Sequence, residues 1–278
     1  MKKHIFYFLL LSCSLQASAQ YYYNDIFVAQ DNQKNISKLV RYKISNITIK
    51  ALDPDGSEAI NFYLNQKVDV AGKTITTFSK SVFSDASILE TRFNTAFQPV
   101  SVLDSSDGAS TRTSYNYDAA GLLQTMQSTS VQIEQKENVA NELRQYRYSK
   151  KGIPVEMIRT KDGRDTIRVT FMPSENDLPG EEQWYKDGKK IETWYYYYDE
   201  QNNLTDIVRY NSAADKMLPD YLFGFDAQGN MTSKVTVQPV TGAFRIWQYI
   251  YNTRGLKTQE IALNKDRKEE GKLVYTYE

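Results

Sequence analysis

The sequence predicts an all-β protein built from consecutive antiparallel β-hairpins. Three observations predict this fold: a motif of two aromatic residues and a turn that recurs about every 26 residues, a second series of turn signals between its copies, and a composition with 21 Tyr among 278 residues. Tyrosine suits half-exposed strands, because its ring packs against the sheet while its hydroxyl group stays in water.

Each copy of the motif has two aromatic residues two positions apart, followed by Asp, Asn or Ser and then by Gly or Asn. Side chains alternate across a strand, so the two rings lie on one face. The Asp, Asn or Ser side chain starts a turn, and the Gly or Asn adopts a left-handed backbone conformation. The copies are 115–122, 146–153, 196–204, 223–231 and 249–256, with degenerate copies at Phe93-Asn94 and 169–171 and a last aromatic pair at 275–277.

A second set of turn signals lies midway between these copies, at 107–108, 161–163, 186–188 and 241–242. Two turns in each period mean two strands, so each repeat is a β-hairpin. We expect residues 89–278 to form an elongated meander sheet or a loose solenoid. A propeller with two repeats in each blade is an alternative.

The pattern Y-x-Y-D-x-x-G, as at 115–121, resembles the YD repeats of the Rhs family. The resemblance covers residues 91–278, and the segment 186–189 before Trp194 also looks like the bacterial MORN-type repeats. The resemblance implies a hairpin-repeat architecture. Rhs proteins are usually far longer and enclose a toxin domain, so we carry over none of the toxin biology.

The first 19 residues are typical of a secretory signal peptide. Lys2 and Lys3 precede an apolar run at 5–11, and an A-x-A cleavage site follows at 17–19. The alternative is a lipoprotein signal with Cys13 as the lipidated residue. Both place the protein outside the cytoplasm, in the periplasm, on the surface or in the medium, and no later segment is apolar enough to form a transmembrane helix.

Residues 20–88 do not carry the motif clearly, and we expect a β-rich cap that covers the first hairpin. A short helix is predicted at 33–40 from apolar residues at helical spacing. Strands are predicted at 42–52, 60–64 and 73–81. The acidic run 53–58 is expected to be a plain turn and not a calcium loop.

The composition excludes several chemistries. His4 and Cys13 are the only His and Cys, so cleavage after Ala19 leaves no His- or Cys-dependent catalysis and no zinc site with these ligands. The chain has 34 basic and 34 acidic residues, and no basic cluster indicates nucleic-acid binding. The neighbouring carboxylates Glu181-Glu182 and Glu269-Glu270 are expected to be solvated surface charges, and no cofactor or metal is predicted.

One group of aromatic residues exceeds what the motif requires. Tyr195 and Tyr197 alternate with Trp194, Tyr196 and Tyr198, which fill structural positions. Together with Trp184 and Tyr185 on the preceding strand, they are the candidate stacking surface for a sugar or a peptide, the alternative being structural cover.

The sequence therefore predicts an exported, non-catalytic scaffold or binding protein of the bacterial cell envelope, whose partner is an unidentified protein or glycan. The alternatives are a carboxylate-dependent enzyme that acts on polysaccharide and a toxin-immunity-like repeat protein. The charged segment 186–190 is expected to be a solvated hairpin tip.

Overall fold

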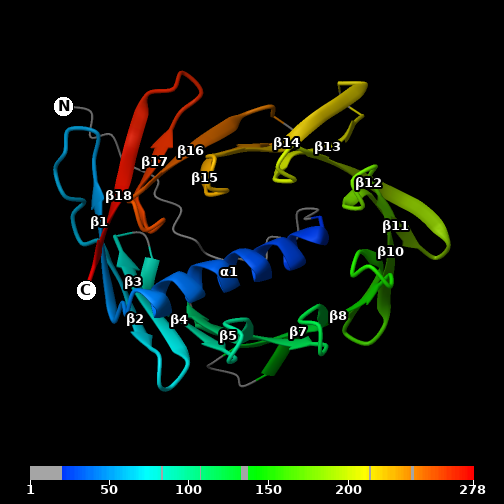
Figure 1. Cartoon of the computed structure of the whole chain (residues 1–278), viewed down its shortest axis with the longest axis horizontal. Coiled ribbons are helices and arrows are strands. Elements are labelled where there is room, and N and C mark those ends of the chain that lie inside the picture. Colours follow the sequence, from blue (N-terminus) through cyan, green and yellow to red (C-terminus); the bar gives the residue numbers. More distant parts are fainter. Residues whose placement is uncertain (1–20, 83, 107, 133–136, 213, 239–240) are drawn as a thin grey trace.

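The computed structural model is a closed β-barrel with one helix inside it (Figure 1). It describes residues 21–278 except 83, 107, 133–136, 213 and 239–240. The predicted signal peptide, Cys13 and the predicted turn residue Asp107 lie outside the described residues. The elements are α1(Tyr23–Arg41), β1(Asn46–Leu52), β2(Tyr63–Asp69), β3(Thr74–Ser81), β4(Ser84–Phe93), β5(Pro99–Ser106), β6(Ala109–Tyr117), β7(Leu123–Gln132), β8(Glu137–Tyr148), β9(Pro154–Lys161), β10(Asp165–Pro173), β11(Pro179–Lys186), β12(Lys189–Tyr198), β13(Leu204–Asn211), β14(Lys216–Phe225), β15(Met231–Val237), β16(Phe244–Tyr251), β17(Lys257–Leu263) and β18(Glu269–Tyr277).

The predicted antiparallel hairpin meander is confirmed, but the expected open sheet or loose solenoid is wrong. Each strand pairs with its neighbours in sequence, and β1 also pairs with β18 in a register that runs from Ile47 opposite Tyr277 to Leu52 opposite Lys272. This pairing closes the 18-stranded sheet into a barrel and leaves it without a free edge. The array closes because residues near its start supply the partner of its last strand.

The N-terminal segment therefore differs from the expected cap. Strands β1 to β4 continue the barrel wall, with β1 between β18 and β2. The short helix predicted at 33–40 lies inside the longer α1, and the turn at 53–58 is present, with Gly56 N donating to the carbonyl of Asp53. The barrel needs this segment for closure, so it is part of the same sheet as the repeats.

The motif turns have the predicted geometry. Asp199 Oδ1 accepts hydrogen bonds from the backbone N–H groups of Gln201 and Asn203, at 2.9 Å each, and Asn202 has φ 64°. The same pattern of two N–H donors recurs at Asn94, Asp118, Ser149, Asp226 and Asn252. These side chains form turns, which confirms their predicted structural role.

One degenerate copy is shifted from its predicted position. The turn after β10 begins at Ser174, so Phe171 is the first aromatic of that copy and Pro173 replaces the second. At the opposite end of the strands, the predicted tips 161–163 and 186–188 are tight turns, in which Asp162 and Asp187 each have φ 49°. Two consecutive residues with positive φ match the twist of a hairpin.

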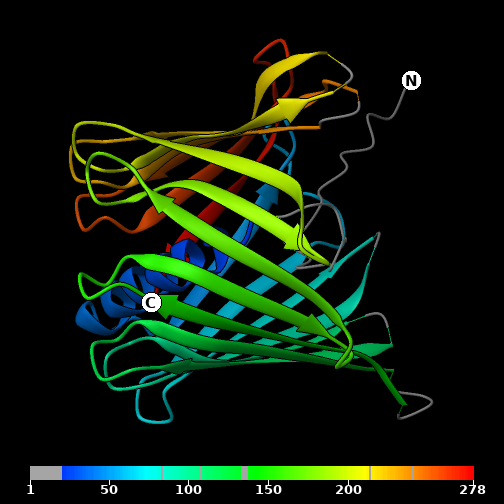
Figure 2. The same cartoon turned by 90° about the vertical axis from the view of Figure 1, so that its right-hand side faces the viewer.

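Helix α1 crosses the barrel near the motif turns (Figures 1 and 2). Its buried side chains are Tyr23, Ile26, Ala29, Ile36 and Leu39. The N-terminal half packs against inward aromatic residues of β6 to β14, and the C-terminal half against apolar residues of β1 to β4 and β18. The barrel is therefore filled at this end by its own chain.

Where the second aromatic of the motif is a tyrosine, it also ties its copy to the strand before it. The hydroxyl group of Tyr198 donates to the carbonyl of Pro179 at 2.7 Å, and that of Tyr251 to the carbonyl of Met231 at 2.8 Å. Tyr117, Tyr148 and Tyr277 make the equivalent bond. These tyrosines thus have a structural role in addition to ring packing.

Candidate functional site

The strands β11 and β12 present two chemically different faces. Trp184, Trp194 and Tyr196 point into the barrel and are buried, and Trp194 is 1% exposed. Tyr195 and Tyr197 point outward, and Tyr197 is 52% exposed. The sequence-predicted alternation along β12 is confirmed.

The four residues of the predicted aromatic surface do not all meet. Trp184 lies inside the barrel, whereas Tyr185, Tyr195 and Tyr197 lie outside. Consecutive strand residues face opposite sides, so Trp184 and Tyr185 cannot line one surface, and the inclusion of Trp184 was wrong. Whether the outward tyrosines bind a ligand stays a prediction.

A shallow cleft of about 260 Å³ lies on the outer wall, between β12 and β13. Tyr195 and Tyr210 line it on either side of Thr193, and Tyr210 is 53% exposed. We call it the tyrosine cleft; its lining residues are Lys190, Ile191, Glu192, Thr193, Tyr195 and Tyr210. Tyr185 lies on the same face, because its hydroxyl group donates to the outward Gln183 at 2.5 Å.

Tyr210 was missed as a candidate because it stands outside the aromatic motif. The alternation of side chains between the two faces of β13 would have identified it. Along β13 it shares the face of Val208, which lies opposite Tyr195, whereas Ile207 and Arg209 point inward. Side chains that are diagonal neighbours across two strands lie about 7–8 Å apart, within reach of aromatic rings.

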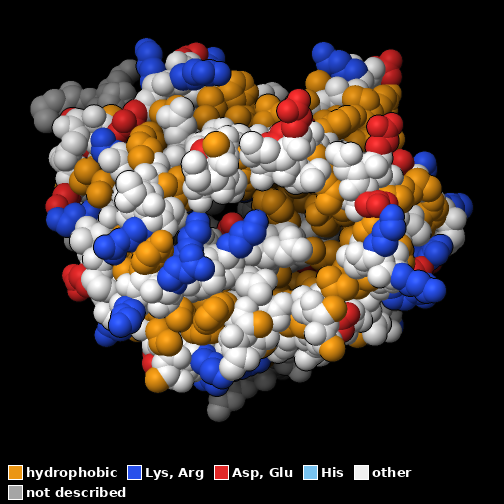
Figure 3. Space-filling model, in the orientation of Figure 1, with side chains coloured by type: hydrophobic (Ala, Val, Ile, Leu, Met, Phe, Trp, Pro, Cys, Tyr) orange, Lys and Arg blue, Asp and Glu red, His pale blue; other side chains and the backbone are white. Residues whose placement is uncertain are grey.

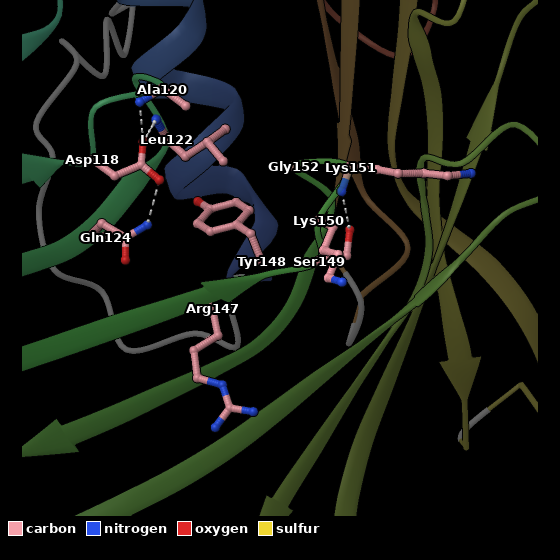
Figure 4. A pocket seen from close by; sticks show the side chains of 10 residues that line it. All are labelled: Asp118, Ala120, Leu122, Gln124, Arg147, Tyr148, Ser149, Lys150, Lys151 and Gly152. Atoms are coloured by element: carbon pink, nitrogen blue, oxygen red, sulfur yellow. Dashed lines mark hydrogen bonds between the residues drawn. The ribbon is translucent and has the colours of Figure 1, made fainter.

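A larger groove, of about 690 Å³, lies between two motif turns, 118–122 and 149–152 (Figure 4). Three of its four charged residues, Asp118, Arg147 and Lys151, have partners in the chain. Asp118 accepts bonds from its own turn, Lys151 pairs with Asp177 at 2.5 Å, and Arg147 pairs with Glu156 at 3.1 Å. Figure 4 shows Arg147 and Lys151 pointing in different directions, so they do not form a converging cationic site.

Inside the barrel, Glu182 anchors the start of α1. Its carboxylate accepts bonds from the backbone N–H groups of Tyr22 and Tyr23, at 2.8 and 2.9 Å, and from Trp184 Nε1 and the Tyr196 hydroxyl group, at 2.5 Å each. A carboxylate at a helix N-terminus satisfies unpaired N–H groups and complements the helix dipole. The expectation that Glu182 is a solvated surface charge is wrong, since its exposed fraction is 0%.

Burial raises the pKa of Glu182 above its ordinary value, while the hydrogen bonds that it accepts act in the opposite direction. All four partners are donors from this chain, and they occupy both carboxylate oxygens. The geometry therefore suits helix anchoring and leaves no free oxygen for a substrate. Its neighbour Glu181 lies on the outer face opposite Tyr195.

An ion-pair network fixes the same end of the helix to the wall. Arg144 Nη1 lies 2.7 Å from Asp25, and Glu142 bridges Arg144 and Arg159 at 2.6 and 2.9 Å. The Tyr146 hydroxyl group donates to Asp25. Burial alone would lower the pKa of Arg144, but Asp25 and Glu142 raise it above its ordinary value, so the guanidinium stays charged.

Among the described residues, no group of His, Cys, Asp and Glu is arranged to hold a metal ion. Within the same residues, no helix has the length and apolar composition needed to cross a membrane. The acidic side chains with clear roles instead form turns, ion pairs or the anchor of α1.

No family model matches the chain, and no curated protein matches it. The solved structures similar to it include a porin-like protein from Bacteroides uniformis, with 10% identity over 84% of this chain and 98% of that one, and a TM-score of 0.37. A porin-like protein from Bacteroides vulgatus has 12% identity over 84% and 98% of the two chains, with a TM-score of 0.31.

The Photorhabdus luminescens Tc holotoxin pore is similar at 9% identity and a TM-score of 0.30. The match covers 84% of this chain but 17% of that chain. All of these TM-scores are below 0.5, so the likenesses assign neither a family nor a role to this protein.

Proposed function

We propose that the protein is an exported, non-catalytic binding protein of the bacterial cell envelope, which holds a glycan or protein on the outer wall of its barrel. The observation that carries the proposal is the contrast between the two faces of β12. The inner face is filled by α1, and the outer face carries Tyr195 and Tyr197. We also propose that the repeats are of the YD type, on the strength of their turn chemistry.

The chemistry of the wall supports a barrel that works in water. Buried aromatic and aliphatic residues face inward, whereas the outward positions of β1 to β11 include many charges: Lys50, Lys67, Glu90, Arg92, Arg112, Arg147, Glu156, Arg168 and Glu181. A membrane-spanning barrel has the reverse pattern, with an apolar outer band around its whole circumference.

The tyrosine cleft is the favoured binding position. Two tyrosines flank Thr193, and Lys190 adds a hydrogen-bond donor beside them. Aromatic faces pack against the apolar faces of sugars and against peptide side chains, while the hydroxyl groups offer hydrogen bonds. The cleft is shallow, which suits an extended chain that lies along the wall better than a small molecule that needs enclosure.

A glycan array and a pull-down from envelope extracts test the proposal, with the chain from Gln20 as the probe. We expect saturable binding without turnover, weakened at least tenfold in the Tyr195→Ala/Tyr210→Ala double variant. Tyr63→Ala is the matched control, because Tyr63 is an outward tyrosine of β2 with 55% exposure. Binding that survives the double variant would refute the assignment of the binding site to the tyrosine cleft. Glycan hydrolysis that one carboxylate substitution abolishes would refute the non-catalytic role.

A further inference from the structure

The outer wall of β13 to β18 differs from the remainder of the barrel. Ten of the apolar residues that register places on its outward face are half-buried or exposed. We call this surface the apolar arc; it consists of Val208, Met217, Leu222, Val235, Val237, Phe244, Ile246, Ile250, Ile261 and Val274.

The assignment of these residues to the outer face follows from pairing. Val235 lies opposite Leu222 on one side and Ile246 on the other. Phe223, the residue after Leu222 on β14, is buried in the barrel core. Side chains alternate along a strand, so Leu222 and its cross-strand partner Val235 point outward. In Figure 3, which looks along the barrel, apolar side chains lie at the upper edge of the molecule in separate groups with polar and charged atoms between them.

The apolar arc has almost no charge. Among the paired outward positions of β13 to β17, Asp206 is the one charged residue, and Lys272, opposite Ile261, adds a basic residue on β18. On the other side of the barrel, β9 and β10 alone place Glu156 and Arg168 on the outer face. The two sides of the barrel therefore differ in the charge of their whole outer face and not only in single exposed residues.

The size of the apolar arc approaches that of a protein interface. The outer wall of six strands, spaced about 4.8 Å apart and about seven residues long, spans roughly 600 Å², and the ten apolar side chains cover about half of it. The largest apolar patch of a typical monomer covers about 300–600 Å². A standard interface buries about 800 Å² on each partner, so the apolar arc and its rim supply most of that area.

We infer that the apolar arc joins two copies of this chain face to face. In a two-fold contact the same surface meets itself, and a surface with two charges of opposite sign, Asp206 on β13 and Lys272 on β18, brings few like charges together. Sheet faces pack at about 10 Å with their side chains interleaved, and the branched residues Val235, Ile246 and Ile261 suit that packing.

A lipid bilayer is the less suitable occupant. The charges on the remainder of the wall oppose insertion of the barrel. Peripheral attachment to anionic lipid draws on a cluster of basic residues beside the apolar face, whereas this face carries one acidic residue, Asp206, and one basic residue, Lys272. The tyrosine cleft borders the apolar arc, because Tyr210 lies opposite Met217 and Tyr195 lies opposite Val208.

Sedimentation velocity of the chain from Gln20 tests the inference. We expect a dimer at micromolar concentration, with the dissociation constant raised at least 100-fold by Ile246→Lys. Ile158→Lys is the matched control, because Ile158 is also a half-buried outward isoleucine, on β9, and it should leave the dimer intact. Circular dichroism establishes that both variants keep the barrel.

A cysteine variant gives a second, independent readout. Residues 21–278 contain no Cys, so Val235→Cys introduces a single thiol near the middle of the apolar arc. Mild oxidation should give a covalent dimer with Val235→Cys and none with Ile158→Cys. A wild-type chain that stays monomeric, or that floats with neutral phosphatidylcholine vesicles through the apolar arc, would overturn the inference. Neither result would affect the glycan and protein binding assays.

Discussion

The two ends of the barrel are built in different ways. At the motif-turn end, aromatic rings and α1 fill the interior, and the turns repeat one hydrogen-bond pattern. Towards the hairpin tips, the inner wall instead carries polar pairs such as Thr111 with Ser130, at 2.9 Å. The difference teaches that the recurring residues of the motif serve turn formation and helix packing, while the tips are free to vary.

The largest expected effect is unfolding at alkaline pH, because the buried tyrosines fill the motif-turn end of the barrel. Burial raises the pKa of Tyr22 to about 12 and holds those of Tyr21, Tyr146 and Tyr196 well above 10. An unfolded tyrosine ionises near pH 10, so above that pH the unfolded state binds fewer protons and stability falls as pH rises. Each such tyrosine lowers the free energy of unfolding by about 1.4 kcal/mol per pH unit.

We therefore expect the barrel to be stable at pH 9 and to unfold cooperatively between about pH 10 and 12. Phenolate absorbance and circular dichroism should change together, because the buried tyrosines ionise as the barrel opens. Full phenolate ionisation in a chain that keeps its native circular dichroism would contradict the filled interior.

The next effect concerns the anchor of α1. Glu182→Gln replaces an acceptor oxygen by an NH₂ group that faces two donors, so we expect a loss of about 3 kcal/mol in the free energy of unfolding. Glu181→Gln, on the adjacent residue but on the outer face, should change it by less than about 0.5 kcal/mol. Urea unfolding of the two variants measures the difference.

Equal and small losses in the two glutamate variants would mean that α1 does not depend on this carboxylate. A fall in the urea m-value for Glu182→Gln alone would instead indicate that the helix leaves the barrel before the wall unfolds, since m scales with the surface exposed on unfolding. Both outcomes bear directly on how firmly the motif-turn end is filled.

The hairpin repeat was predictable because its signals are local. A turn such as that at Asp199 depends on five consecutive residues, and alternation separated Tyr196 from Tyr197. Barrel closure was not predictable in this way. It depends on a pairing between Ile47 and Tyr277, which are far apart in the sequence and carry no mutual signal.

The errors at the candidate site have the same origin. Glu182 is charged, and charged residues are rarely fully buried unless they are paired, so sequence reasoning placed it on the surface. Its phase with Trp184 and its position opposite Phe171 put it on the inner face. Alternation predicts that direction, but the donors that stabilise the carboxylate come from the start of α1, which only the folded barrel brings near.

The smallest expected effect compares one turn at each end. Asn252 and Asn264 each accept two backbone N–H bonds, at 3.0 and 3.1 Å and at 2.9 and 3.0 Å. Only the turn at Asn252 also holds α1, because the carbonyl of Gly255 accepts a bond from Lys38 Nζ at 3.0 Å. We expect Asn252→Ala to cost about 1.5 kcal/mol and Asn264→Ala about 0.5–1 kcal/mol in urea unfolding. A larger loss for Asn264→Ala would show that the helix adds nothing to the motif turns, and the distinction between the two ends would then rest on the aromatic rings alone.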